Sequence, residues 1–105
     1  MKYTHPPFGA AADLFPRELD GAQVLYYTEK DDFGVVCDVD GNVTDQVRYL
    51  AICRYEKDKH FYLFLCDENY EVVIDHFLPS VKDCKSVAYN RKKDILWNKC
   101  KYKKI

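Results

Sequence analysis

The chain has 105 residues, of which 48% are hydrophobic and 31% are charged, and its formal net charge is −1. This composition is typical of a single folded domain over residues 1–105 and excludes a disordered polymer. No apolar run reaches the roughly 18 residues of a membrane span. The first residues also lack the apolar segment of a secretory signal, so the expected location is the cytosol.

The charge is divided unevenly along the chain. Residues 1–81 hold 15 acidic and 7 basic side chains, whereas residues 82–105 hold 2 acidic and 9 basic side chains. An acidic body repels nucleic acid and attracts basic protein surfaces. The basic end can bind either a phosphate backbone or the acidic body itself, and the sequence leaves both open.

The first half of the chain predicts an irregular lead-in followed by strands. Prolines and glycines bracket a short helix expected over 10–14 within the lead-in, 5–21. Residues 40–42, Asp-Gly-Asn, tolerate positive φ and predict a tight hairpin. The apolar alternation changes phase near Arg48, which predicts a bulge or bend there. Strands are expected over residues 23–28, 33–39 and 43–55.

Residues 49–76 are predicted to form three antiparallel strands with one aliphatic face. Short polar turns at 56–59 and 67–70 fix the register. The pairs that they set are Ile52 with Leu63, Leu50 with Leu65, Leu65 with Val72, and Leu63 with Ile74. All of these side chains lie on one face, and a slip of one residue would move the whole set to the other face.

A helix of about three turns is expected to cover this aliphatic face. Ser80 is a preferred N-cap residue and Asp83 completes a capping box. Apolar residues then recur at helical spacing up to Ala88, and residues 95–97 form either a last strand or a helical continuation. The predicted fold class is α+β: an antiparallel β-meander of about four to five strands, one amphipathic C-terminal helix packed on one face, and the short N-terminal helical lead-in.

No metal or cofactor is expected. The five cysteines include no CxxC pair and are predicted to be reduced, structural thiols. In the predicted register Cys53 and Cys66 lie roughly 13 Å apart along the strands, too far for a shared zinc or a disulfide. The loop 38–44 departs from the calcium-loop pattern in the place of its glycine. Four glycines are too few to build a nucleotide cradle.

The second face of the three strands combines aromatic rings with carboxylates. Its residues are predicted to be Tyr49, Ala51, Cys53, Tyr55, His60, Tyr62, Phe64, Cys66, Glu71, Val73 and Asp75. Tyrosine beside acid is typical of a surface that selects a basic protein partner. The alternative is that the first 20 residues or the first hairpin cover this face.

The sequence therefore predicts a small cytosolic protein-binding domain without enzymatic activity, whose partner is a basic protein. One concrete form is an immunity or antitoxin protein that neutralises a nuclease-type toxin, by analogy of size and charge. The candidate partner-binding residues are Tyr55, Tyr62, Glu71 and Asp75, with Asp31, Asp32, Asp38 and Asp40 as a second acidic patch.

Two other function classes remain open from the sequence. A small enzyme or ligand-binding domain would use a pocket between sheet and helix around His76, Ser80 and Cys84. A nucleic-acid-binding module would use the basic residues of 91–104, whose last six residues, 99–104, interleave an aromatic side chain with lysines. Exposed strand edges also permit a dimer by sheet extension.

Overall fold

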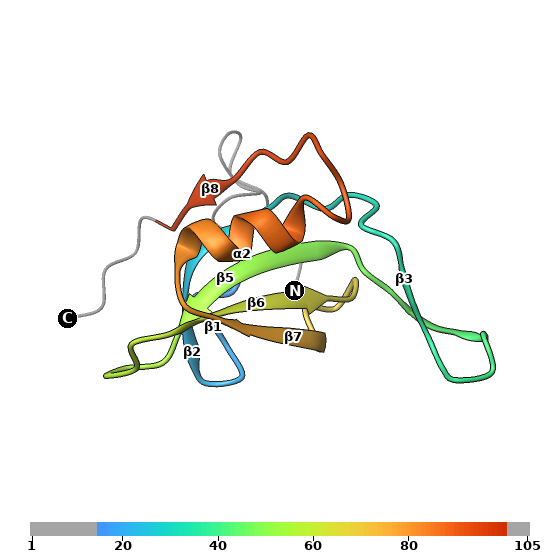
Figure 1. Ribbon diagram of the computed structural model, residues 1–105, viewed down its shortest axis with the longest axis horizontal. Helices are drawn as coiled ribbons and strands as arrows, with labels where there is room; N and C mark the ends of the chain where they lie inside the picture. The colour runs from blue at the N-terminus through green and yellow to red at the C-terminus, as the bar shows by residue number, and fades with distance from the viewer. Residues whose placement is uncertain (1–14, 101–105) are drawn as a thin grey trace, which may run out of the picture.

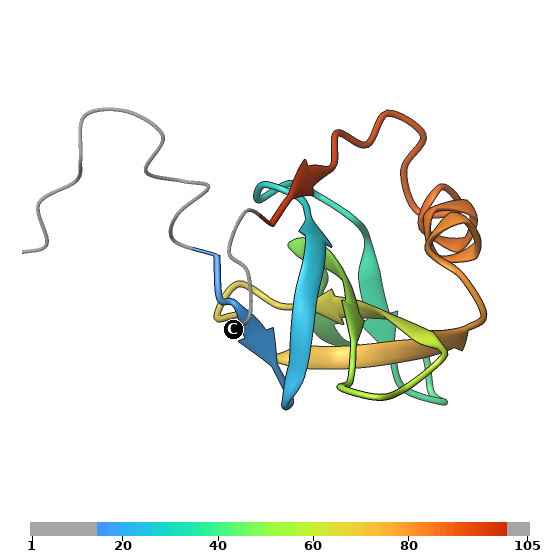
Figure 2. The same cartoon turned by 90° about the vertical axis from the view of Figure 1, so that its left-hand side faces the viewer.

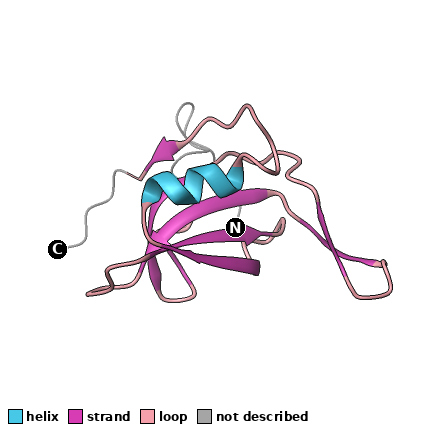
Figure 3. Ribbon diagram, viewed as in Figure 1, coloured by secondary structure: helices cyan, strands magenta, loops and turns pink. Residues whose placement is uncertain are grey.

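The computed structural model describes residues 15–100, which fold mostly as antiparallel β-structure with one short helix, α2 (Val81–Ala88), after the long strands (Figures 1 and 3). The strands are β1 (Glu18–Leu19), β2 (Ala22–Tyr27), β3 (Val35–Cys37), β4 (Val43–Gln46), β5 (Tyr49–Arg54), β6 (Phe61–Cys66), β7 (Val72–Leu78) and β8 (Asn98–Lys99). The helix expected over 10–14 lies outside the described residues.

The main sheet has the strand order β1-β2-β5-β6-β7, with β8 paired to β2. It curls into a half-barrel (Figure 2). Strands β3 and β4 form a separate two-stranded ribbon that projects from the body (Figure 1). The predicted α+β class therefore holds in its coarse form. The simple meander was wrong for the first half, because β2 pairs with β5 across the chain instead of with the strand that follows it.

The bend predicted near Arg48 is confirmed, and it divides the expected strand 43–55 into β4 and β5 of different sheets. Val47 lies in the break and is fully buried. Its N–H donates to the carbonyl of Gly34 at 2.8 Å, and its carbonyl accepts from Phe33 at 3.0 Å. Because Phe33 and Gly34 bond to this break, the strand expected over 33–39 shortens to β3.

The register between β5 and β6 is confirmed, with Ile52 opposite Leu63 and Leu50 opposite Leu65. The register between β6 and β7 was wrong by two residues, since Leu65 faces Ile74 and Leu63 faces His76. The loop between β6 and β7, residues 67–71, holds one residue more than the expected turn, which shifts the register by one residue. An irregularity between Leu65 and Cys66 shifts it by one residue more. A shift of two residues preserves the faces, so Ile74 still packs on the aliphatic side.

The irregularity exchanges the faces of two valines at the start of β7. Val72 packs against the cluster around Cys53, and Val73 packs against the cluster beneath α2. The sequence placed Val73 on the aromatic face and Val72 on the aliphatic face. Strict alternation fails there because a β-bulge interrupts the pleat.

Hydrophobic side chains are buried on both faces of the sheet. The helix-side cluster comprises Phe33, Val47, Leu50, Ile52, Leu63, Leu65, Cys84 and Ala88. The cluster on the other face comprises Phe15, Leu19, Ala22, Val24, Tyr27, Ala51, Cys53, Phe64 and Cys66. Phe15 and Leu19 precede β2, so residues from the first 20 cover part of the second face. The sequence had allowed either these residues or the first hairpin as its cover.

Helix α2 contacts β5, β6 and β7. The N-cap is confirmed, because the N–H of Asp83 donates to Ser80 Oγ at 3.0 Å. Ser80 Oγ also donates to Asp83 Oδ2 at 2.8 Å, a bond between side chains where a capping box has a bond to the backbone N–H of the cap residue. The helix has eight residues, about two turns instead of three. It ends early because Asn90 and Arg91 donate to carbonyls three residues back, which tightens the last turn.

Candidate protein-binding surface

Four rings at the end of β7 form a continuous aromatic patch, which we define as Tyr55, His60, Tyr62 and Phe77. The Tyr55 and Tyr62 rings meet edge to face at 5.2 Å between centroids. Phe77 lies 5.1 Å from Tyr62 and 4.5 Å from His60. Phe77 leaves 56% of its surface exposed, so the patch presents a large apolar side chain to solvent.

The turn between β1 and β2 holds Tyr55 in place. Tyr55 Oη donates to the carbonyl of Asp20 at 2.9 Å. Asp20 and Gly21 both have positive φ, 49° and 84°, which two-residue hairpin turns require. The sequence reasoning placed these residues in an irregular lead-in. The dipeptide Asp-Gly between Leu19 and Ala22 is the signal that indicates this hairpin.

Carboxylates lie beside the patch. Asp75 is exposed and pairs in register with Phe64, two residues before Phe77 on the same face. Burial raises the pKa of the Tyr55 hydroxyl, and the nearby charges of Asp20 and Asp75 raise it further. The carboxylates of Asp20 and Asp75 thus place negative charge near this hydroxyl.

A second group of rings lies elsewhere on this face. The Phe15 ring stacks on Tyr27 at 4.6 Å, and the Tyr49 ring stacks on Tyr70 at 4.6 Å. Burial and a hydrogen bond with Tyr49 raise the pKa of Tyr70 to about 12. These four rings line a cavity of about 240 Å³ together with residues 28–30. Tyr49 and Tyr70 are half-buried, as Tyr55 and Tyr62 are, so the aromatic patch differs from this second group of rings through the exposed ring of Phe77.

Three of the eight residues predicted to bind a partner lie together: Tyr55, Tyr62 and Asp75. Glu71 was expected on the strand beside Asp75, but it lies in the loop before β7. Its N–H donates to Asp67 Oδ1 at 3.0 Å, and its side chain is exposed. Phe77 was missed because the face was followed only as far as Asp75; continuing the alternation by two residues finds it.

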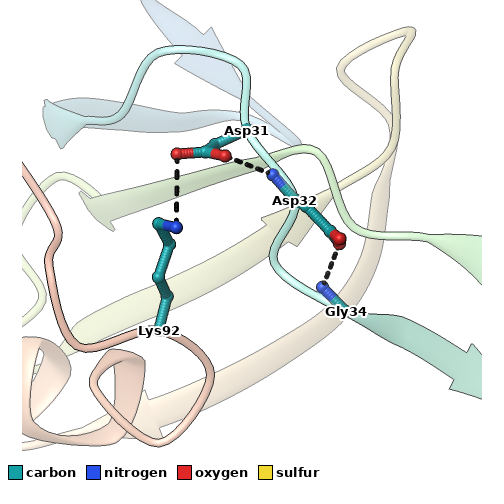
Figure 4. A network of polar contacts seen from close by, with 4 residues as sticks. All are labelled: Asp31, Asp32, Gly34 and Lys92. Atoms are coloured by element: carbon teal, nitrogen blue, oxygen red, sulfur yellow. Dashed lines mark hydrogen bonds and ion pairs between the residues drawn. The ribbon is translucent and has the colours of Figure 1, made fainter.

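Asp31 and Asp32 bond within the fold (Figure 4). Asp31 Oδ1 accepts the N–H of Asp32 at 2.7 Å, and Asp31 Oδ2 lies 3.7 Å from Lys92 Nζ. Asp32 Oδ1 accepts the N–H of Gly34 at 3.0 Å. Arg91 donates to the carbonyl of Phe33 at 3.1 Å. The first two residues of the basic segment 91–104 thus contact the acidic body.

Asp38 and Asp40 lie at the tip of the β3–β4 ribbon, at the opposite end of the molecule from the β5–β6 turn (Figure 1). Asp38 Oδ1 accepts the N–H groups of Asp40 and Asn42, both at 2.9 Å. These backbone hydrogen bonds lower the pKa of Asp38. The structure thus places the second acidic patch in two separate loops, neither of which adjoins the aromatic patch.

Two of the three groups proposed for a pocket between sheet and helix, Ser80 and Cys84, have structural roles. Cys84 is fully buried, and burial raises the pKa of its thiol to about 12, which disfavours the reactive thiolate. The Ser80 hydroxyl is engaged by Asp83 in the cap. Within residues 15–100, no group of three His, Cys, Asp or Glu side chains is arranged to hold a metal ion. In the same range no helix combines the length and the apolar character needed to cross a bilayer.

Comparison of the chain with protein-family models, curated proteins and solved structures finds no match. The functional interpretation therefore depends on the geometry of the aromatic patch and the charges beside it.

Proposed function

We propose that this chain is a small binding protein that engages a basic protein partner through the aromatic patch and Asp75. The observation that carries the proposal is Phe77, which is 56% exposed although it lies in a row of ring contacts with Tyr62 and His60. Clustered, rigid rings supply apolar contact area at low entropic cost and are enriched among interface hot spots.

The charge around the patch favours a basic partner. Asp75 projects beside Phe77, and the carboxylates of Asp20 and Asp75 both act on the Tyr55 hydroxyl. Residues 54–81, which include all four rings, contain six carboxylates against three basic side chains, Arg54, Lys57 and Lys59. An excess of negative charge accelerates encounter with a basic surface and disfavours acidic competitors.

The concrete form of this proposal is an immunity or antitoxin protein that blocks a nuclease-type toxin. Nucleases bind phosphate backbones with basic clefts, and an acidic surface with aromatic anchors matches such a cleft in charge and in chemistry. The supporting measurement is inhibition of a basic nuclease encoded beside this chain in its genome. A neighbouring nuclease that retains full activity in excess of this protein would contradict the toxin-inhibitor form.

The direct test is affinity capture from extract of the source organism, followed by binding measurements on the captured protein. Asp75→Lys and Phe77→Ala alter the patch. Asp40→Lys and Val39→Ala are matched controls, because Asp40 is an exposed carboxylate and Val39 a fully exposed apolar side chain on the distant ribbon.

We expect a captured protein with a basic surface whose affinity falls at least about tenfold with either patch variant, which corresponds to roughly 1.4 kcal/mol. The ribbon controls should change the affinity by less than about threefold. A partner that is not basic, or one that is lost with the ribbon variants and retained with Asp75→Lys, contradicts the proposal.

A further inference from the structure

Strand β7 is an edge of the main sheet. Among residues 15–100 it pairs with β6 alone, whereas β6 has a neighbour on each side (Figures 1 and 2). Its seven residues, Val72–Leu78, span about 23 Å in extended form, and Pro79 follows at once. The outer backbone N–H and C=O groups of such an edge are a template for another strand.

Beyond the irregularity at its start, the edge carries few of the usual devices that block strand addition. Natural edge strands carry lysine, an internal proline or a bulge that twists the edge away. Strand β7, Val-Val-Ile-Asp-His-Phe-Leu, contains neither lysine nor proline, and its register with β6 is regular from Ile74 onward. Asp75 is its one carboxylate, and this residue lies on the same face as Phe77.

A second copy of the same strand is a poor occupant of this edge. Two copies of β7 paired antiparallel about its middle residue place Asp75 opposite Asp75, and like charges directly opposite each other are destabilising. Each copy would also bring a segment, 61–81, with four carboxylates and no lysine or arginine. Lys30, whose Nζ lies 3.3 Å from Glu68, offsets one of these charges. The edge therefore favours a basic strand over a copy of itself.

We infer that β7 accepts an extended basic segment of the partner by strand addition; this inference rests on the proposed function. On the face of the aromatic patch, the added strand carries lysine or arginine next to Asp75 and an apolar side chain next to Phe77. The alternate residues of the added strand lie on the other face, beside Ile74 and His76. Main-chain hydrogen bonds supply the affinity, and these alternate positions supply the specificity.

The test uses a fluorescein-labelled nine-residue peptide, Lys-Thr-Val-Thr-Lys-Thr-Val-Thr-Lys, whose odd positions place lysine and valine on one face. Binding is measured by fluorescence anisotropy at about 50 mM salt. Two further peptides carry backbone N-methyl groups, one at the odd positions and one at the even positions. In an extended strand only every second N–H faces the neighbouring strand. We therefore expect one methylated peptide to bind at least about tenfold more weakly and the other to bind within about threefold of the parent.

The variants separate this inference from the proposed function. Asp75→Lys should weaken the unmethylated peptide at least about tenfold, and Asp40→Lys should leave its affinity unchanged. If the peptide binds in an Asp75-dependent way but both methylated forms bind alike, strand addition is wrong and the proposed function stands. The same conclusion follows if no peptide binds while the captured protein still depends on Asp75. If Asp75→Lys changes neither the affinity for the peptide nor the affinity for the captured protein, both strand addition and the proposed function are wrong.

Discussion

Replacing Phe77 with alanine should lower the free energy of unfolding by only about 1 kcal/mol. Full burial of a phenylalanine is worth about 1.5–3 kcal/mol, and less than half of the Phe77 side chain is buried. Its ring contacts with Tyr62 and His60 add a fraction of the 0.5–1.5 kcal/mol typical of an aromatic pair. The neighbouring Phe64 is 1% exposed, so Phe64→Ala should cost about 3–5 kcal/mol.

Urea denaturation of both variants measures this difference, with the fluorescence of Trp97, the only tryptophan of the chain, as the reporter. With a slope of about 1–3 kcal/mol per molar urea, Phe77→Ala should shift the midpoint by roughly 0.5 M. Phe64→Leu provides the comparison if Phe64→Ala fails to fold. A loss for Phe77→Ala as large as that for Phe64→Ala would show a buried ring and refute the exposed patch.

Three further predictions concern the parts of the fold that support the patch. Ser80→Ala removes the N-cap of α2 and should lower the unfolding free energy by about 1 kcal/mol, whereas Ser80→Thr keeps the hydroxyl and should retain most of it; equal losses for both variants would contradict the capping role. In the native protein, a thiol reagent such as DTNB should label exposed Cys37 fast and the fully buried thiols only on unfolding, because burial raises their pKa; rapid labelling of more than two thiols would contradict this. The fully buried thiols are Cys53, Cys66 and Cys84. The folded pKa of Asp38 is lowered, so its contribution to stability is present above the unfolded value of about 3.9 and is lost as the pH falls through the folded value. The stability difference between wild type and Asp38→Asn should therefore be constant near neutral pH and shrink below about pH 4, and a difference independent of pH would contradict it.

Short sequence patterns predicted the features that depend on residues close together in the chain. The β5–β6 register followed from one short turn and from side-chain alternation, and the start of α2 followed from Ser80 and Asp83. The predicted β6–β7 register was wrong because a shift of two residues leaves every side chain on the same face, so the alternation pattern does not detect it. The pairing of β2 with β5 joins residues that are 24 (Tyr27 and Ala51) to 31 (Gln23 and Arg54) positions apart, and no local pattern specifies such a contact.

The candidate surface was predicted only in part, for a related reason. Alternation placed Tyr55, Tyr62 and Asp75 on one face, and the structure confirms that placement. Composition alone also suggested the carboxylates of Asp31 and Asp38 as binding groups. In the fold these side chains accept backbone N–H groups of their own loops, a competing use that charge counting does not reveal.

The most direct test of the central claim is amide hydrogen exchange of the chain with and without its captured partner. The account predicts that the partner slows exchange over residues 55–62 and in β7, over 72–78, and leaves the β3–β4 ribbon unchanged. Protection confined to the ribbon or to α2, with no change in β7, would contradict it.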